Sequence, residues 1–311
     1  MSSSSTPAST THAGPTIHSA WLAAVLALLL LAAPRVAPAQ LTPDRTYYGH
    51  GREIPVTVES PVGEDSEAHV VLFTAAGDRV ARASVLPGAV DLASFFPILW
   101  SQNEPQVLYA QMYIDDASAD GGDPGDLGEP VGPPLVLQPL VTPLRAMNNP
   151  DRSIRWQKAP QLFSGMRIYV DKLLKLETTE GEMVFRFRPD EAPNTVWHIR
   201  ELARGGFYTD IPFHRVVPTH PTGMPFVIQA GDPTGTGMGG PGVNIDLEPS
   251  ELPHAFGVLS MARGGNPDSN GSQFFIALSR EATVHLNGSY TAFGEAVAGA
   301  DAILAIERTP L

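Results

Sequence analysis

The chain has 311 residues, enough for two domains of ordinary size, and 43% of them are hydrophobic, so a sizeable core is expected. Its 33 acidic residues against 20 basic ones give a net charge of −13, which argues against a nucleic-acid partner because phosphate binding needs clustered Lys and Arg. The absence of cysteine excludes a disulfide scaffold and a thiolate metal site.

The N-terminus has the pattern of a secretory signal. Residues 20–33 form an apolar run, and Ala37-Pro38-Ala39 before Gln40 is typical of a cleavage site, so we predict a signal peptide over residues 1–39. The run is short for ~30 Å of hydrocarbon, which makes an uncleaved membrane anchor the alternative. We therefore predict an exported protein, periplasmic or secreted, without stable membrane insertion after cleavage.

The next region, residues 40–144, has apolar runs of strand length between turns rich in Pro and Gly. This pattern predicts a small antiparallel β sandwich. The strands are expected at residues 53–59, 69–73, 80–86, 107–114 and 135–140. The region shows no catalytic constellation, and its role stays open.

An acidic loop interrupts this region at residues 115–129, where five aspartates lie among glycines. A calcium site is one interpretation. The loop lacks the 1,3,5 ligand spacing and the terminal glutamate of an EF-hand, which favours a solvated acidic loop. We therefore predict no metal site.

Residues 145–164 mix Pro, Asn, Asp and Arg and predict a linker to a second domain, 165–311. That domain opens with strand-like runs at 173–178 and 182–188. Pro193 then suits the first turn of a helix.

Four motifs follow in order: FHRV from Phe213, QAGDPTGTGMGG from Gln229, GVLSMAR from Gly257 and GSQFFI from Gly271. They resemble the central motifs of the cyclophilin-type peptidyl-prolyl isomerases. The resemblance covers roughly residues 167–310. It implies a mainly β protein in which the sandwich is followed by a cyclophilin-like eight-stranded β barrel with two flanking helices. It also implies cis/trans isomerisation of X-Pro bonds in proline-containing segments of client proteins, with no cofactor.

Such an activity needs no covalent chemistry. An X-Pro bond isomerises slowly because amide resonance imposes a barrier of ~18–20 kcal/mol. A catalyst has only to favour the twisted amide, whose nitrogen is pyramidal and attracts a fixed cationic donor. The resemblance implies that Arg215, the arginine of FHRV, is this catalytic donor.

The same resemblance implies a set of substrate-binding residues. They are Phe226, Val227, Gln229, Ala262, Arg263, Gln273, Phe275, His285, Leu286 and Tyr290. By this resemblance, the apolar members are expected to form a slot for the proline ring, and the two glutamines to orient the arginine and hold the peptide. The backbone of Ala262 and Arg263 matches the family's peptide-binding edge.

Three features depart from the family pattern. Residues 219–225 form a longer loop beside the slot, where the family usually has about one residue. His285 stands where cyclosporin-sensitive members have tryptophan, and Tyr290 where many have histidine. After a predicted helix at 300–307 the family usually continues into a last strand, which we expect to be missing here or replaced. Residues 167–172 are a candidate to cover the open edge.

The alternative to an isomerase is a non-catalytic module, either a proline-peptide-binding chaperone or an envelope scaffold. An intact Arg215 favours the enzyme, because a module selected only for binding has no need of the arginine. We therefore expect an isomerase that assists the folding of exported proteins.

Overall fold

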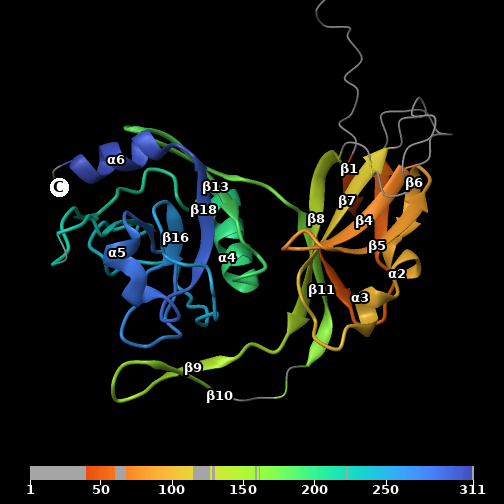
Figure 1. The fold of residues 1–311 in the computed structure, drawn as a ribbon, viewed down its shortest axis with the longest axis horizontal. Helices are drawn as coiled ribbons and strands as arrows, with labels where there is room; N and C mark the ends of the chain where they lie inside the picture. The colour runs from red at the N-terminus through yellow and green to blue at the C-terminus, as the bar shows by residue number, and fades with distance from the viewer. Residues whose placement is uncertain are drawn as a thin grey trace, which may run out of the picture. The chain divides into compact units, whose positions relative to one another are not determined.

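The computed structural model describes residues 40–59, 68–114, 127, 130–157, 160, 162–221 and 223–309. In these ranges the chain is mainly β and forms several antiparallel sheets (Figure 1). No helix of the described part is long and apolar enough to cross a membrane. The predicted signal peptide and nearly all of the acidic loop at 115–129 lie outside the described residues.

The N-terminal region contains two principal sheets. The larger one has the order β2-β11-β8-β7-β4-β5, with bounds β2 (Tyr47–Gly49), β11 (Phe163–Val170), β8 (Pro130–Val141), β7 (Leu108–Ile114), β4 (Ala68–Thr74) and β5 (Arg79–Val85). The smaller one has the order β1-β3-β6, with bounds β1 (Gln40–Pro43), β3 (Pro55–Glu59) and β6 (Gly88–Asp91). Two short helices, α2 (Leu92–Phe95) and α3 (Ile98–Ser101), follow β6.

Both sheets contribute to one apolar core. Val56 and Val58 enter it from β3, where buried residues alternate with more exposed ones, and Leu135 and Leu137 enter it from β8. The alternation expected from the sequence therefore gives each sheet one buried face, and both buried faces contribute to the same core. The assignment of this region as a β sandwich stays a prediction.

The predicted linker contains regular structure. β9 (Arg145–Asn148) and β10 (Ile154–Gln157) pair as an antiparallel hairpin. β11 crosses the expected boundary at residue 164 and pairs with β8 and β2. Met166 and Ile168 on β11 are buried in the N-terminal core, so most of the segment 167–172 lies in that sheet and not at the edge of the barrel.

The C-terminal region is a curled half-barrel, in which Figure 1 labels β13, β18 and β16. It has seven antiparallel strands in the order β12-β13-β18-β16-β17-β15-β14. Their bounds are β12 (Leu174–Thr178), β13 (Gly181–Phe187), β18 (Ala292–Ala298), β16 (Val258–Met261), β17 (Phe274–Ala277), β15 (Val227–Ala230) and β14 (Arg215–Val217). Among the described residues, β12 and β14 each have one strand neighbour, so the eighth strand of the expected barrel is not among them.

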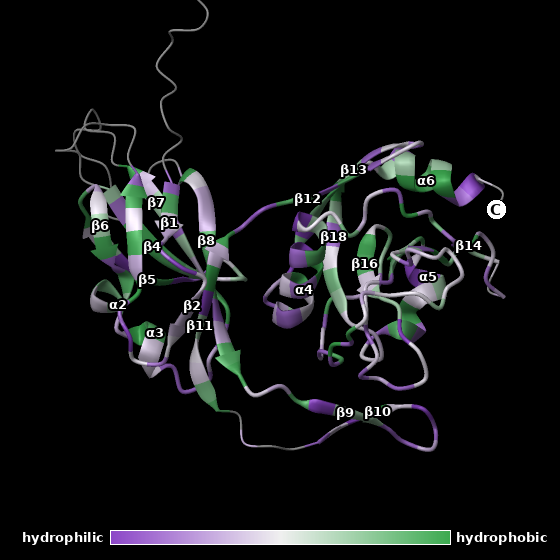
Figure 2. Cartoon of the chain, turned by 180° about the vertical axis from the view of Figure 1, so that it is seen from behind, coloured by the Kyte–Doolittle hydropathy of each residue, from purple (hydrophilic) through white to green (hydrophobic). Residues whose placement is uncertain are grey.

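The half-barrel has its own apolar core. β13 points Met183, Phe185 and Phe187 into it. β16 is buried along its whole length. Its ribbon is largely green, that is hydrophobic, in Figure 2. The two flanking helices are α4 (Pro193–Arg204) and α6 (Ala300–Arg308), while a short α5 (Arg280–Thr283) runs into the 3-10 turn η1 (Val284–Leu286). The fold implied by the resemblance is therefore confirmed for this region.

Helix α4 is capped by a distant carboxylate because its own N-cap residue, Ala192, has no capping side chain. Both oxygens of Glu248 accept hydrogen bonds from the first turn, at 3.0 Å from the Asn194 N–H and 2.7 Å from the Thr195 N–H. Burial raises the pKa of Glu248 despite these donors. The cap ties the loop around residue 248 to the helix.

Candidate active site

The register of two neighbouring strands places the predicted catalytic arginine beside a glutamine. Arg215 on β14 lies directly opposite Gln229 on β15. The Arg215 Nη1 donates to Gln229 Oε1 at 3.1 Å. Among the described residues, this bond orients the exposed guanidinium and leaves its other N–H donors for a ligand.

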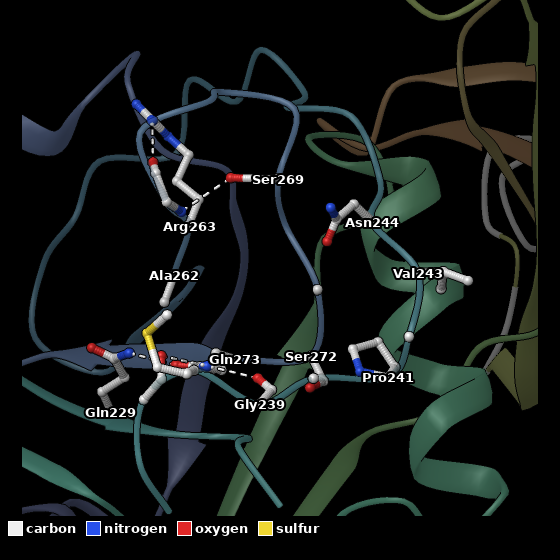
Figure 3. Close-up of a pocket in the computed structure, with 16 residues that line it drawn as sticks. Gln229, Gly239, Pro241, Val243, Asn244, Ala262, Arg263, Ser269, Ser272 and Gln273 are labelled. Atoms are coloured by element: carbon white, nitrogen blue, oxygen red, sulfur yellow. Dashed lines mark hydrogen bonds between the residues drawn. The ribbon is translucent and has the colours of Figure 1, made fainter. Parts of the chain in front are cut away.

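The glutamine is itself held by a series of amide contacts. Gln229 Nε2 donates to Gln273 Oε1 at 2.9 Å. Gln273 Nε2 then donates to the carbonyl oxygens of Gly237 and Gly239, at 3.1 and 2.8 Å. Figure 3 shows these contacts along one side of a cavity. The arginine is thus oriented by two side-chain amides that end on backbone carbonyls.

A buried aspartate shapes the glycine-rich turn that supplies those carbonyls. Asp232 accepts hydrogen bonds from the N–H groups of Thr234 at 2.7 Å and Gly237 at 2.6 Å. Burial works against ionisation, but the N–H groups of Gly239, Thr234 and Gly237 outweigh it and hold the pKa of Asp232 well below its usual value. Gly231 has a φ of +94°, and a Cβ there would meet the Ser272 carbonyl oxygen, so the turn requires glycine.

The apolar residues of the predicted slot form a cluster separate from the barrel core. Val227, Phe275 and Leu286 are buried in it. Strand alternation causes the separation, because the neighbours Ile228 and Phe274 point to the other face, into the main core. One face of β15 and β17 therefore builds the barrel and the other builds the site.

Ten of the predicted residues line one cavity of about 230 Å³. They are Arg215, Phe226, Val227, Gln229, Ala262, Arg263, Phe275, His285, Leu286 and Tyr290. Gln273 lines a neighbouring cavity of about 570 Å³, shown in Figure 3, which shares Gln229, Ala262 and Arg263 with the first. The structure thus brings together all eleven side chains chosen from the sequence, in two adjoining cavities.

The predicted peptide-binding edge is partly engaged within the protein. The Ala262 N–H donates to the Gln273 carbonyl oxygen at 2.9 Å. In the described part of the chain, the Ala262 carbonyl and the Arg263 N–H have no such partner. These two groups are therefore the ones that this edge offers to a peptide.

A buried histidine supports the slot from behind, and sequence reasoning missed it. His254 stacks on Phe275 with ring centroids 5.8 Å apart, while Tyr290 meets the same ring edge-on at 5.9 Å. His254 Nδ1 lies 2.8 Å from Asn287 Oδ1 and its Nε2 lies 2.9 Å from Ser260 Oγ. Burial lowers the pKa of His254, which fits a neutral ring that donates at one nitrogen and accepts at the other. His254 belongs to no recognisable motif, so the sequence carried no signal for it.

The longer loop contributes to the rim of the slot. His220, from residues 219–225, has its ring centroid 5.0 Å from that of Phe226 and 5.6 Å from that of His285. His285 also stacks on Phe226 at 5.7 Å with an interplanar angle of 12°. The rim is therefore a three-ring stack, where the sequence indicated only a substituted tryptophan.

The two cavities offer an apolar slot, a cation beside it and free backbone groups at its edge. Across the described ranges, no three His, Cys, Asp or Glu side chains gather as a metal site would need. A site of this kind can hold a ring in the slot and present a fixed cation to an atom next to it.

Comparisons with known proteins find one family. The family described as "Cyclophilin type peptidyl-prolyl cis-trans isomerase/CLD" matches residues 173–311. A peptidyl-prolyl cis-trans isomerase of Synechococcus elongatus is 44% identical over 120 residues, which cover 39% of this chain and 77% of the relative. Peptidyl-prolyl cis-trans isomerase B of Bacillus subtilis is 45% identical over 121 residues, 38% of this chain and 78% of the relative. A crystal structure of a Cryptosporidium parvum cyclophilin type isomerase shares 33% identity, covering 45% of this chain and 86% of that one, with a TM-score of 0.41.

Proposed function

This chain belongs to the cyclophilin-type peptidyl-prolyl cis-trans isomerase family, and on that premise we propose that it isomerises X-Pro bonds of exported proteins and so assists their folding. The activity class follows from the family. The clients and the folding role are our proposal, drawn from the N-terminal sequence and the form of the site.

One observation carries the mechanism: Arg215 is held by Gln229 at the edge of a slot that is lined by Val227, Phe275 and Leu286. A proline ring in the slot brings its nitrogen to the guanidinium. As the amide twists, that nitrogen gains a lone pair, and the hydrogen bond from Arg215 becomes stronger than in either planar state. No covalent intermediate and no proton transfer are needed.

Export is supported by the apolar run at 20–33 and by Ala37-Pro38-Ala39, both outside the described residues. We expect mass spectrometry of the protein from its native host to find a mature N-terminus near Gln40. An intact N-terminus on protein that fractionates with membranes would support a retained anchor instead. An intact N-terminus on freely soluble cytosolic protein would refute export.

The catalytic proposal is tested with the purified chain and a short proline peptide whose cis and trans forms give separate NMR signals. We expect exchange between the two forms to accelerate in proportion to the enzyme concentration. Binding of the peptide without acceleration would contradict the proposal and leave a proline-binding module.

A further inference from the structure

The two adjoining cavities carry charge of one sign. Arg215 and Arg263, the two cations among their lining side chains, come from β14 and from the segment after β16. Among the described residues that line these cavities there is no Asp or Glu. The whole chain has 33 acidic and 20 basic residues, so the site is a basic patch on an acidic protein.

The Arg263 side chain is held in place over the rim. Its Nε and Nη2 donate to the Ser289 carbonyl oxygen at 3.2 and 2.9 Å, and its Nη1 donates to the Gly264 carbonyl oxygen at 3.1 Å. The guanidinium carbon lies 4.7 Å from the centroid of the Tyr290 ring. Three hydrogen bonds and an aromatic face therefore order this half-buried side chain before any ligand arrives.

These contacts orient the charge of Arg263 without neutralising it. Carbonyl oxygens and a ring face carry no net charge. In the described part of the chain, the carboxylates that form ion pairs do so with other cations and not with Arg263 or Arg215. A carboxylate brought by a ligand would thus be the first to form an ion pair with this guanidinium.

Arg263 also stands where a bound peptide has to pass. With Gln229 and Ala262, it lines both the slot and the larger cavity. A peptide whose proline fills the slot and whose chain continues into the larger cavity therefore crosses Ala262 and the base of Arg263. Figure 3 shows Ala262 between Gln273 and Arg263.

We propose that the enzyme selects prolines flanked by acidic residues, with Arg263 as the specificity-determining residue that receives an Asp or Glu within two positions of the proline. The inference rests on the proposed isomerase function and adds a substrate class to it. It also gives the Arg263 side chain a role, where the family resemblance implied only its backbone. Attraction of Glu and repulsion of Lys at a partly exposed site together predict a ratio of about three- to tenfold in kcat/KM.

The test uses the full chain and sets of proline peptides that carry Glu, Gln or Lys at each of the two positions on either side of the proline. Isomerisation is measured by NMR exchange, which needs no coupling protease. We expect the Glu peptide of at least one set to exceed the Lys peptide by about three- to tenfold. The ratio should approach one between about 0.1 M and about 1 M NaCl, because the screening length falls from about 10 Å to about 3 Å.

Two variants and a control assign the effect to its residue. Arg263→Gln should abolish the Glu-to-Lys ratio, and Arg263→Lys should keep part of it, because the charge remains although the hydrogen bonds and the ring contact of the guanidinium are lost. Arg308→Gln, in the last turn of α6, makes the same change in net charge at an exposed residue that lines neither cavity. It should leave the ratio as it is in the unmodified chain.

The Gln peptides distinguish a failure of the acidic preference from a failure of the isomerase function. Turnover of Gln peptides with equal rates for Glu and Lys would overturn the acidic preference and leave the isomerase intact. A ratio that survives in Arg263→Gln, or that falls equally in Arg308→Gln, would refute the role of Arg263. Absence of turnover with every peptide would overturn the isomerase function and the preference with it.

Discussion

Replacement of Arg215 by alanine tests the proposed mechanism most directly. The change removes the guanidinium that Gln229 holds at the edge of the slot, and a hydrogen bond to a charged group contributes about 1.5–3 kcal/mol. If that bond is made mainly to the twisted amide, kcat/KM falls by about 10- to 150-fold. The fold should survive, because Arg215 is exposed and its backbone pairing with β15 does not need the side chain.

A double-mutant cycle with Gln229 shows how much of the fall in kcat/KM depends on the contact between Arg215 and Gln229. Gln229→Ala keeps the Arg215 cation but removes the hydrogen bond that orients it. Loss of about 1 kcal/mol of transition-state stabilisation predicts about a fivefold fall in kcat/KM. In the Arg215→Ala background the same substitution should cost much less, since the acceptor has no guanidinium left to orient.

NMR exchange on one proline peptide gives all four rates, and circular dichroism checks that each variant is folded. Turnover of Arg215→Ala at the rate of the unmodified protein would refute the role of the guanidinium. If the effects of the two substitutions on kcat/KM were independent and additive, the view that Gln229 acts by orienting Arg215 would be refuted.

Three further predictions follow from the rim, the support of the slot and the open edges of the sheet. His285→Trp should increase the affinity for cyclosporin, measured by titration calorimetry, because an indole adds an N–H donor and a broader apolar face; tight binding to the unmodified protein would contradict this. Burial lowers the pKa of His254 from 6.5, so its contribution to stability is complete above pH 6.5 and is lost as the pH falls toward the folded-state pKa. Thermal melts should therefore lose less stability on acidification in His254→Gln than in the unmodified protein, and equal losses would count against the assignment. Amides on the outer edges of β12 and β14, which have no strand partner among the described residues, should exchange faster than those of β16, and equal protection in hydrogen-exchange mass spectrometry would show that other groups cover them.

The site residues that lie in contiguous strand motifs could be predicted from the sequence. Arg215 and Gln229 come from two adjacent strands, and alternation alone decides that Val227 faces the slot while Ile228 faces the core. The resemblance then supplied the barrel to which these strands belong, which periodicity could not.

The supporting residues were not predictable, because their roles depend on contacts between distant segments. His254 acts through a ring contact with Phe275, and Glu248 caps a helix that begins more than fifty residues earlier. The stacking of His220 on the rim depends on the conformation of a loop that has no periodic pattern.

The place of β11 could not be predicted for a different physical reason. An alternating strand such as β11 suits either sheet, and the sequence around Met166 does not say which apolar core receives it. Only the pairing with β8 decides that it belongs to the N-terminal sheet.

The series of contacts from Arg215 through Gln229 and Gln273 to the carbonyls of Gly237 and Gly239 joins a guanidinium to side-chain amides and backbone carbonyls, and it includes no carboxyl group and no imidazole. The direction of the guanidinium is therefore insensitive to the acidity of the surroundings. Acidification can destabilise the packing behind the slot, but it does not change the orientation of the Arg215 guanidinium.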